Sequence, residues 1–176
     1  MFGSVKLYVM RHGPAEDTAA TGRDEDRALT ASGRDRVRNV VKLLQREGEM
    51  PGRILASRLV RAHQTAEIVA AAAKAAGWRG TVETVAELAP GGKNVALCHA
   101  LVRAHGSDAA GPMLVGHEPD LSSLIDDLLG SPMPLSMDKA MVVALELGDD
   151  GAATLRFILE PRAVAVVHDA RMIDPP

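Results

Sequence analysis

The stretch VKLYVMRHGPAE, residues 5–16, carries the strongest structural signal in the chain. Its first half, residues 5–10, is a short apolar run with β-branched and aromatic positions, which is typical of a strand buried on both faces. The group Arg11-His12-Gly13-Pro14 follows directly and ends the run. The sequence therefore predicts a buried strand that delivers an arginine and a histidine at its carboxyl end.

The segments downstream alternate between helical and extended patterns. A helix that begins at Thr30 carries apolar residues at the i, i+3, i+4, i+7 spacing and stops at Gly48. Glycine, proline and hydrophobic patterns place the remaining elements. Helices are expected at residues 59–76, 95–105 and 120–129, and short strands at residues 54–57, 82–85 and 113–115. Residues 141–147 and 153–160 are expected to form a hairpin across the turn Gly-Asp-Asp-Gly.

Strands that alternate with helices pair in parallel through right-handed crossovers. The predicted fold class is α/β, a three-layer α/β/α sandwich whose mostly parallel sheet carries a C-terminal antiparallel hairpin at or near one edge. With 176 residues and neither a repeat nor a linker, we expect one domain over residues 1–176. Ligands bind outside the carboxyl ends of parallel strands, so residues 11–13, 57–61 and 116–117 are expected on one rim.

Composition narrows the classes of function. Aromatic residues make up 2% of the chain and the net charge is −3, so neither a base-stacking surface nor a broad basic field for nucleic acid is expected. Cys98 is the one cysteine, which excludes an internal disulfide, and its apolar helix face indicates a core position. The apolar run within residues 1–10 is far shorter than the roughly 20 residues that span a bilayer. We therefore expect a cytoplasmic protein that does not associate with membranes.

Two arginines and two histidines are predicted to meet on the rim. Arg11 and Arg61 each offer a planar guanidinium that matches two phosphate oxygens and keeps its charge at physiological pH. His12, whose ordinary pKa is about 6.5, can be neutral and nucleophilic, and Gly13 allows close approach of the backbone to a phosphate. With His117 on the same rim, the set is typical of a phosphate site.

Five segments carry a family resemblance: LYVMRHGPAE, RALTASGR, SRLVRAHQTAEIV, ELAPGG and LVGHEPDLSSLI, in this order. Over residues 6–129 the chain resembles the histidine phosphatase superfamily, which is phosphoglycerate mutase-like, and within it the small SixA-like phosphohistidine phosphatases. The resemblance implies that His12 accepts the phosphoryl group as a covalent phosphohistidine. It also implies that Arg11 and Arg61 bind that group and that His117 is the second pocket histidine. No metal and no other cofactor are implied.

The chain departs from the family pattern at two places. The family usually has Ser-Pro where this chain has Ser57-Arg58, and often a carboxylate where this chain has Pro14. Arg58 is therefore an alternative to Arg61 as the second phosphate-binding arginine. The charged run at residues 23–27 is expected to be a solvated loop, although Arg27 could fold over the pocket rim. The remaining histidines, expected to be structural or exposed, are His63, His99, His105 and His168.

The leaving group decides the substrate class. An alkoxide needs a general acid, for which Glu87 is the candidate because it follows a predicted strand at the position where larger relatives carry a glutamate. An imidazole is protonated near pH 6.5 and needs little help. The chain is too short for the insertions that build lids over small substrates in larger relatives, which favours hydrolysis of phosphohistidine on a phosphorylated protein. A monomer is expected. A small sugar or nucleotide-derived phosphate ester is the alternative substrate.

Two other classes of protein compete with a histidine phosphatase. A passive phosphate-binding module would keep the arginines but would have no need for His12 or His117. A metallohydrolase that uses the two histidines is the other rival, yet neither histidine belongs to the helical i, i+4 pair of common zinc motifs. The intact set of four residues therefore favours the phosphatase.

Overall fold

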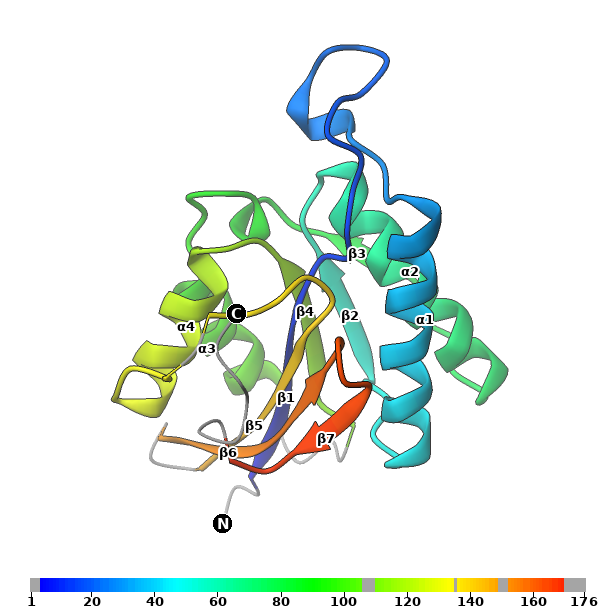
Figure 1. The fold of residues 1–176 in the computed structure, drawn as a ribbon. Helices are drawn as coiled ribbons and strands as arrows, with labels where there is room; N and C mark the ends of the chain where they lie inside the picture. Colours follow the sequence, from blue (N-terminus) through cyan, green and yellow to red (C-terminus); the bar gives the residue numbers. More distant parts are fainter. Residues whose placement is uncertain (1–3, 106–109, 135, 149–151, 170–176) are drawn as a thin grey trace.

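The computed structural model describes residues 4–105, 110–134, 136–148 and 152–169 of the chain (Figure 1). Helices and strands alternate over most of this length. In chain order they are β1 (Val5–Arg11), the 3-10 turn η1 (Asp24–Asp26), α1 (Ala31–Arg46), β2 (Arg53–Ala56), α2 (Val60–Ala75), β3 (Val82–Thr84), the 3-10 turn η2 (Ala86–Leu88), α3 (Asn94–His105), β4 (Pro112–Gly116), α4 (Asp120–Leu129), β5 (Val142–Leu147), β6 (Ala153–Glu160) and β7 (Ala165–Val167).

One sheet of seven strands runs through the molecule in the order β3-β2-β4-β1-β5-β6-β7. The pairs β3-β2, β2-β4 and β4-β1 are parallel, whereas β5, β6 and β7 are each antiparallel to the strand before them in that order. The predicted α/β class, with a parallel core and antiparallel C-terminal strands, is confirmed. The predicted helices and strands lie close to their expected bounds.

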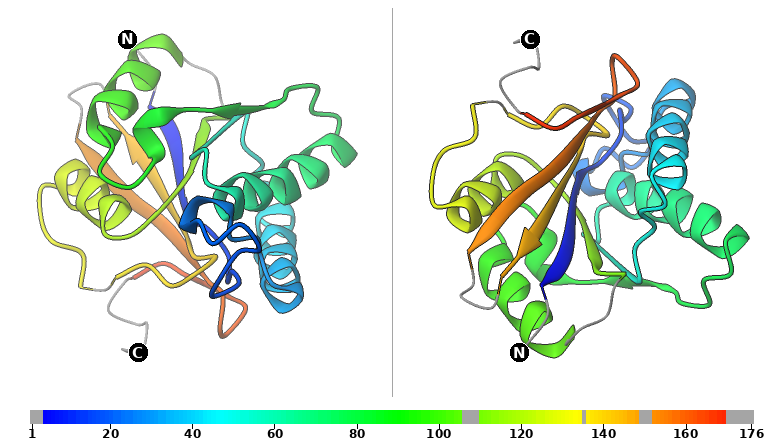
Figure 2. Two further views of the ribbon diagram at one scale, coloured as in Figure 1. Left: turned by 90° about the horizontal axis from the view of Figure 1, so that it is seen from above. Right: turned by 90° about the horizontal axis from the view of Figure 1, so that it is seen from below.

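Helices cover both faces of the sheet, so the sheet is the middle one of three layers (Figure 2). Alternate residues of β1 point to opposite faces, as the period of a strand requires. Tyr8 and Met10 pack in the cluster of apolar side chains beneath α1 and α2, while Leu7 and Val9 pack in the cluster beneath α3 and α4. The central strand is therefore buried on both faces, as its apolar run predicts.

The strand β7 is absent from the sequence prediction. Its three residues, Ala165–Val167, are all only half-buried and pair with β6 at the edge of the sheet. So short a run carries no alternation of polar and apolar residues that a sequence pattern can detect. The hairpin therefore extends to a three-stranded antiparallel unit, in which β5 lies inside the sheet next to β1. Its turn, residues 149–151, lies outside the described residues.

The start of α1 is locked against the segment that follows β1. Thr30 caps the helix, because its Oγ1 accepts the N–H of Gly33 at 2.8 Å. Its own N–H donates to the carbonyl oxygen of Pro14 at 3.1 Å. A Cβ at position 33 would lie 2.0 Å from that same carbonyl oxygen, so only glycine fits there. This contact fixes the direction in which the chain leaves β1.

Candidate functional site

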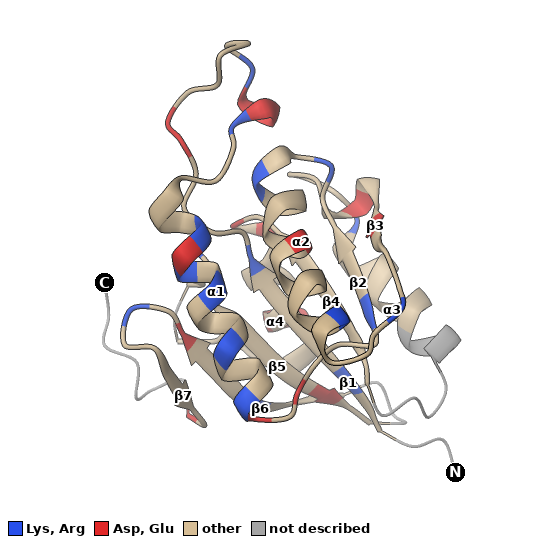
Figure 3. Cartoon of the chain, turned by 90° about the vertical axis from the view of Figure 1, so that its right-hand side faces the viewer, with Lys and Arg blue, Asp and Glu red and all other residues tan. Residues whose placement is uncertain are grey.

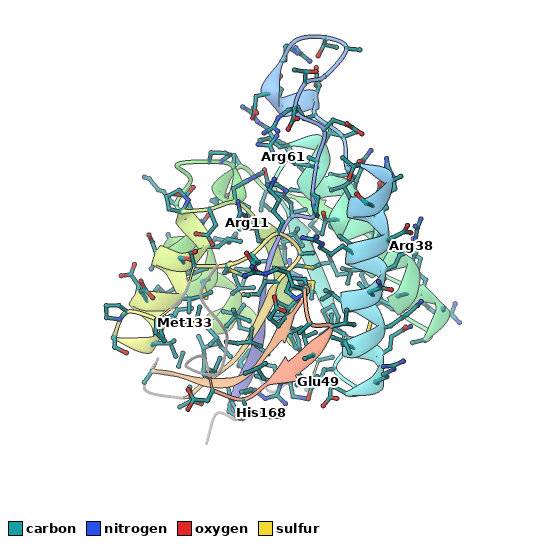
Figure 4. All side chains as sticks on the ribbon, in the orientation of Figure 1. Arg11, Arg38, Glu49, Arg61, Met133 and His168 are labelled. Atoms are coloured by element: carbon teal, nitrogen blue, oxygen red, sulfur yellow. The ribbon has the colours of Figure 1, made fainter. Side chains whose placement is uncertain are left out.

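The four residues predicted to meet do lie together at the carboxyl ends of the parallel strands. Arg11 ends β1, His12 follows it, His117 follows β4, and Arg61 is in the first turn of α2. The backbone N–H of His12 donates to the carbonyl of Gly116 at 3.1 Å, and the two histidine rings have centroids 5.1 Å apart. Figure 4 shows Arg11 and Arg61 at this end of the sheet.

The ring of His12 is held in one orientation. Its Nδ1 lies 2.7 Å from the carbonyl oxygen of Gly13, and because a carbonyl can only accept, Nδ1 carries the proton. The lone pair of the neutral ring is then on Nε2. Burial lowers the pKa of His12 to about 3, with further lowering by the charges of Arg61 and Arg11. The ring is thus neutral at physiological pH.

Gly13 supports this arrangement through packing and hydrogen bonding. Its N–H donates to Thr65 Oγ1 at 3.0 Å, and that hydroxyl donates to the carbonyl of Arg61 at 2.7 Å. A Cβ at position 13 would lie 2.6 Å from Cγ2 of Val37 on α1. The N–H of Gly13 is therefore already bonded, and the glycine serves the site by its carbonyl and by its close contact with α1. No sequence pattern indicates this role of Thr65.

His117 is oriented by the serine that directly follows β2, the strand beside β4. Its Nε2 lies 2.8 Å from Ser57 Oγ, and the same hydroxyl oxygen accepts the N–H of Leu59 at 3.3 Å. When the hydroxyl donates to Nε2, the proton of neutral His117 is on Nδ1, and Nδ1 is buried without a hydrogen-bond partner among the described residues. Burial lowers the pKa of His117 to about 4. Ser57 is thus a positioning residue that the strand-end pattern placed on the rim.

Arg61 is 5% exposed and is hydrogen-bonded to Asp24, which lies in the loop between β1 and α1. Its two terminal nitrogens donate to Asp24, one to the backbone carbonyl at 2.8 Å and one to Oδ2 at 2.9 Å. The other carboxylate oxygen of Asp24 accepts Nε of Arg27 at 2.8 Å. In Figure 1 this loop, with η1, extends from the carboxyl end of the sheet. Asp24 is exposed, as expected for a solvated loop, and in addition it contacts the buried Arg61.

Arg11 is anchored from the segment before β5. One of its terminal nitrogens donates to the carbonyl oxygen of Met137 at 2.7 Å. The Nε atoms of Arg11 and Arg61 are both buried and have no partner in the described part of the chain. An unpaired buried donor costs about 1–3 kcal/mol. These donors, together with Nδ1 of His117, form a cationic site suited to the oxygens of a phosphate.

The other candidates lie at different places. Arg58 is exposed, in contrast to the buried Arg61. Glu87 is exposed on η2, which packs beside the end of β4, where a Cβ on Gly116 would lie 3.5 Å from the carbonyl oxygen of Leu88. Arg27 bonds to Asp24 and to the carbonyl of Glu16, so it lies in the loop above the site.

The remaining histidines and the cysteine lie away from this constellation. His63, His99 and His168 are half-buried or exposed, and the side chain of His105 lies outside the described residues. Cys98 is fully buried in the core beneath α3 and α4, as the sequence predicts. Burial raises the pKa of its thiol to about 11.

In residues 4–105, 110–134, 136–148 and 152–169, three or more His, Cys, Asp or Glu side chains are nowhere grouped so that they could hold a metal ion. Of the helices over these residues, none combines the length and apolar character needed to cross a membrane.

The chain matches a protein-family model and two curated relatives. Residues 7–91 match the model of the histidine phosphatase superfamily (branch 1). An uncharacterized protein of Picosynechococcus is 37% identical over 147 residues, which cover 82% of this chain and 86% of that protein. The phosphohistidine phosphatase SixA of Escherichia coli is 28% identical over 158 residues, covering 89% of this chain and 94% of that protein.

Solved structures agree with the sequence relatives. The protein histidine phosphatase SixA in complex with tungstate superposes with a TM-score of 0.80 at 26% identity, over 92% of this chain and 100% of that one. The fold is also that of a mycobacterial glucosyl-3-phosphoglycerate phosphatase, with a TM-score of 0.67 at 19% identity, over 87% of this chain and 97% of that one. The chain therefore belongs to the histidine phosphatase superfamily and is a SixA-like phosphatase.

Proposed function

We propose that this phosphatase hydrolyses phosphohistidine carried by another protein, and that His12 carries the phosphoryl group between two half-reactions. The observation that carries the proposal is the hydrogen bond from Nδ1 of His12 to the carbonyl of Gly13 at 2.7 Å. It leaves the lone pair of a neutral imidazole on Nε2. Nε2 of His12 is therefore the proposed nucleophile.

In the first half-reaction, the lone pair of Nε2 forms a bond to phosphorus. The bond from phosphorus to the leaving atom breaks, and its electron pair departs with the leaving group. Arg11, Arg61 and Nδ1 of His117 are proposed to hold the non-bridging oxygens, where negative charge is spread during transfer. The buried donors without partners on these residues support that role.

In the second half-reaction, a water molecule attacks the phosphorus of the His12 adduct. The P–N bond breaks, its electron pair returns to Nε2, and the proton lost by the water goes to solvent. On this scheme the site releases phosphate from a histidine in every turnover, whatever the substrate. Transfer from one imidazole to another exchanges equivalent P–N bonds and requires no strong acid from the enzyme. The scheme therefore suits a phosphohistidine substrate.

The relatives support the same substrate class. The curated relative of Escherichia coli is named a phosphohistidine phosphatase, and the solved SixA structure is that of a protein histidine phosphatase. The second candidate is a small phosphate ester. It is favoured by the position of Glu87 on η2 beside the end of β4, where a carboxylic acid could protonate an alkoxide.

The two candidates differ in their demand for Glu87. We expect the wild-type enzyme to hydrolyse a phosphohistidine peptide faster than a phosphoserine peptide or a sugar phosphate at equal enzyme concentration. Glu87→Gln should change phosphohistidine hydrolysis less than about threefold. If Glu87 is an acid for esters, the same change should lower ester hydrolysis by about 10² to 10⁴.

Glu47→Gln is the matched control, because Glu47 is an exposed acid at the far end of α1. A wild-type enzyme that prefers sugar phosphates, and loses that preference with Glu87→Gln but not with Glu47→Gln, would exclude the phosphohistidine substrate in favour of the ester.

A further inference from the structure

A groove between α1 and α2 lies outside the site described above. It has a volume of about 540 Å³. We define the α1–α2 groove by three cations on α1 and three residues on α2 that line it: Arg34, Arg38, Lys42, Gln64, Ile68 and Ala72. Figure 3 shows the basic residues of α1 on the face of the molecule where α1 and α2 lie side by side.

The charge of α1 contrasts with that of the whole chain. The helix sequence ASGRDRVRNVVKLLQR holds five basic residues and one acid, a formal charge of +4, whereas the complete chain has a net charge of −3. Arg38 pairs with that acid, Asp35, at 2.7 Å, and both side chains are largely exposed. Lys42 makes no ion pair with any described residue. An exposed pair of this kind contributes little to stability. Because the basic residues of α1 outnumber its one acid, the helix keeps a positive surface that steers anions toward it.

The spacing of the three groove cations matches a helix. Arg34, Arg38 and Lys42 are four residues apart, so they lie on one face of α1 and span about 12 Å along its axis. The floor between the helices is apolar, since Ile68 and Ala72 are only partly buried against the core cluster. Glu67 is the acid that lines the groove, and it lies 3.6 Å from His63.

The groove is continuous with the segment that leaves the site. Gln64 lines the groove, and its Oε1 accepts the N–H of Leu29 at 2.8 Å and a weaker bond from Arg34 at 3.4 Å. The next residue, Thr65, holds the N–H of Gly13. A partner bound along the groove would therefore reach the end of the sheet where His12 lies.

We propose that the α1–α2 groove docks an acidic amphipathic helix of the phosphorylated protein substrate. This inference rests on the proposed function, because it assigns the groove to the protein that presents the phosphohistidine. An acidic helix matches both the cationic stripe and the apolar floor, and the helix-in-groove mode combines the two. A nucleic acid would use the charges but not the floor.

The test uses two synthetic peptides that carry one phosphohistidine and a helical arm. One arm has Glu at every fourth residue beside Leu, and the other has Gln at the same places. Free phosphohistidine serves as the small substrate. We expect wild-type kcat/KM to be about tenfold higher for the Glu arm than for the Gln arm, since a few rim charges act mainly on association.

The decisive variants reverse two charges on α1. The double variant Arg38→Glu/Lys42→Glu should lower kcat/KM for the Glu arm about tenfold and leave free phosphohistidine within twofold. The double variant Arg36→Glu/Arg46→Glu makes the same charge change on the same helix outside the groove, and should cost less than about threefold. Equal losses in both double variants, or none in either, would overturn the docking site. Circular dichroism checks that both variants are folded.

Binding separates this proposal from the proposed function. Fluorescence anisotropy of the unphosphorylated Glu arm measures docking without turnover, and wild-type binding should weaken about tenfold in Arg38→Glu/Lys42→Glu. If the enzyme does not turn over phosphohistidine in any form, the proposed function fails, and the anisotropy result alone decides whether the groove binds an acidic helix. A single-stranded oligonucleotide of equal charge that competes as well as the Glu arm would overturn the assignment to a protein helix.

Discussion

Both ends of β1 hold a cluster of ionisable side chains, and Figure 4 shows labelled members at opposite ends of the sheet. The site cluster at the carboxyl end consists of Arg11, His12, Arg61 and His117. The far-end cluster consists of Lys6, Tyr8, Glu49 and Arg156. The two clusters lie on the same strand but differ in how their polar groups are paired.

In the far-end cluster, the other three side chains all donate to the carboxylate of Glu49. Glu49 accepts hydrogen bonds from Arg156 at 2.5 and 3.0 Å, from Lys6 at 3.1 and 3.2 Å, and from the hydroxyl of Tyr8. The hydrogen bonds from Arg156 are the first cause that lowers the pKa of Glu49 to about 2. In the site cluster, by contrast, three buried nitrogens have no partner among the described residues and both histidines have lowered pKa values. The far-end cluster stabilises the fold, and the site cluster is available to a ligand.

The largest expected effect comes from removing the proposed nucleophile. His12→Ala should lower kcat by at least about 10³, because loss of a covalent nucleophile removes the whole reaction path. The variant should stay folded, with only a small change in the free energy of unfolding. Urea unfolding followed by circular dichroism measures that change. Wild-type enzyme quenched after mixing with labelled substrate should carry acid-labile, alkali-stable phosphate, and the variant should not. A folded variant with more than about one per cent activity contradicts the role of His12.

The next effect separates two arginines on the same rim. Arg61→Ala should weaken binding of vanadate by about 10², because a buried charge-assisted clamp is lost, while Arg58→Ala should cost less than about threefold because Arg58 is exposed. Lysine at position 61 should not restore binding, since a point charge cannot reproduce two parallel hydrogen bonds. Isothermal titration calorimetry measures all three variants. The opposite order of losses would assign the clamp to Arg58.

The far-end cluster should affect stability rather than activity. The lowering of the pKa of Glu49 from 4.5 to about 2 favours the folded state, by about 1–2 kcal/mol once solvent screening of this partly exposed cluster is allowed for. Glu49→Gln should therefore reduce the free energy of unfolding at pH 7 by about that amount and leave kcat/KM within twofold. Urea unfolding and a steady-state assay test the two parts. A large fall in activity without a loss of stability would contradict the division between the clusters.

The two clusters should also act in different pH windows. The stabilising contribution of Glu49 is complete above its ordinary pKa of 4.5 and is lost as the pH falls toward about 2. The histidines remain neutral in the folded state while the unfolded chain binds protons below pH 6.5, so they cause a loss of stability that begins near pH 6.5 and extends to about pH 4 for His117 and about pH 3 for His12. Glu49→Gln should flatten only the lower window, which unfolding measured from pH 7 to pH 3 resolves.

The smallest effect tests the aspartate that the loop places on Arg61. Asp24→Asn keeps an oxygen that can accept from Arg61 but removes a charge that competes with phosphate. Because the Asp24 side chain is 65% exposed, we expect only about a two- to fivefold gain in affinity for vanadate. Asp35→Asn, an exposed acid on α1 away from the site, is the control and should have no effect. A loss of affinity in Asp24→Asn would instead mean that the carboxylate is needed to orient Arg61.

Local sequence patterns were sufficient for most of the architecture. Apolar alternation and helical spacing depend on residues a few positions apart, so they predicted the parallel strands, the helices and the rim at which residues 11–13, 57–61 and 116–117 meet. The strand β7 was missed because three half-buried residues carry no such pattern. Thr65 and Ser57 act through single hydrogen bonds to residues distant in the chain, which no local pattern records.

Only the tertiary structure decided which polar groups are paired. Arg61 is buried because it lies in the first turn of α2, among the residues of that helix that face the core, whereas Arg58 is exposed in the turn between β2 and α2. The hydrogen bond between Asp24 and Arg61 joins residues 37 positions apart, and the one between Arg156 and Glu49 joins residues 107 positions apart. Burial and partner geometry set pKa values and the availability of donors, and both arise only when distant segments pack together. The sequence by itself determined the fold and the chemical groups of the site, and packing determined which of them remain free to bind a phosphate.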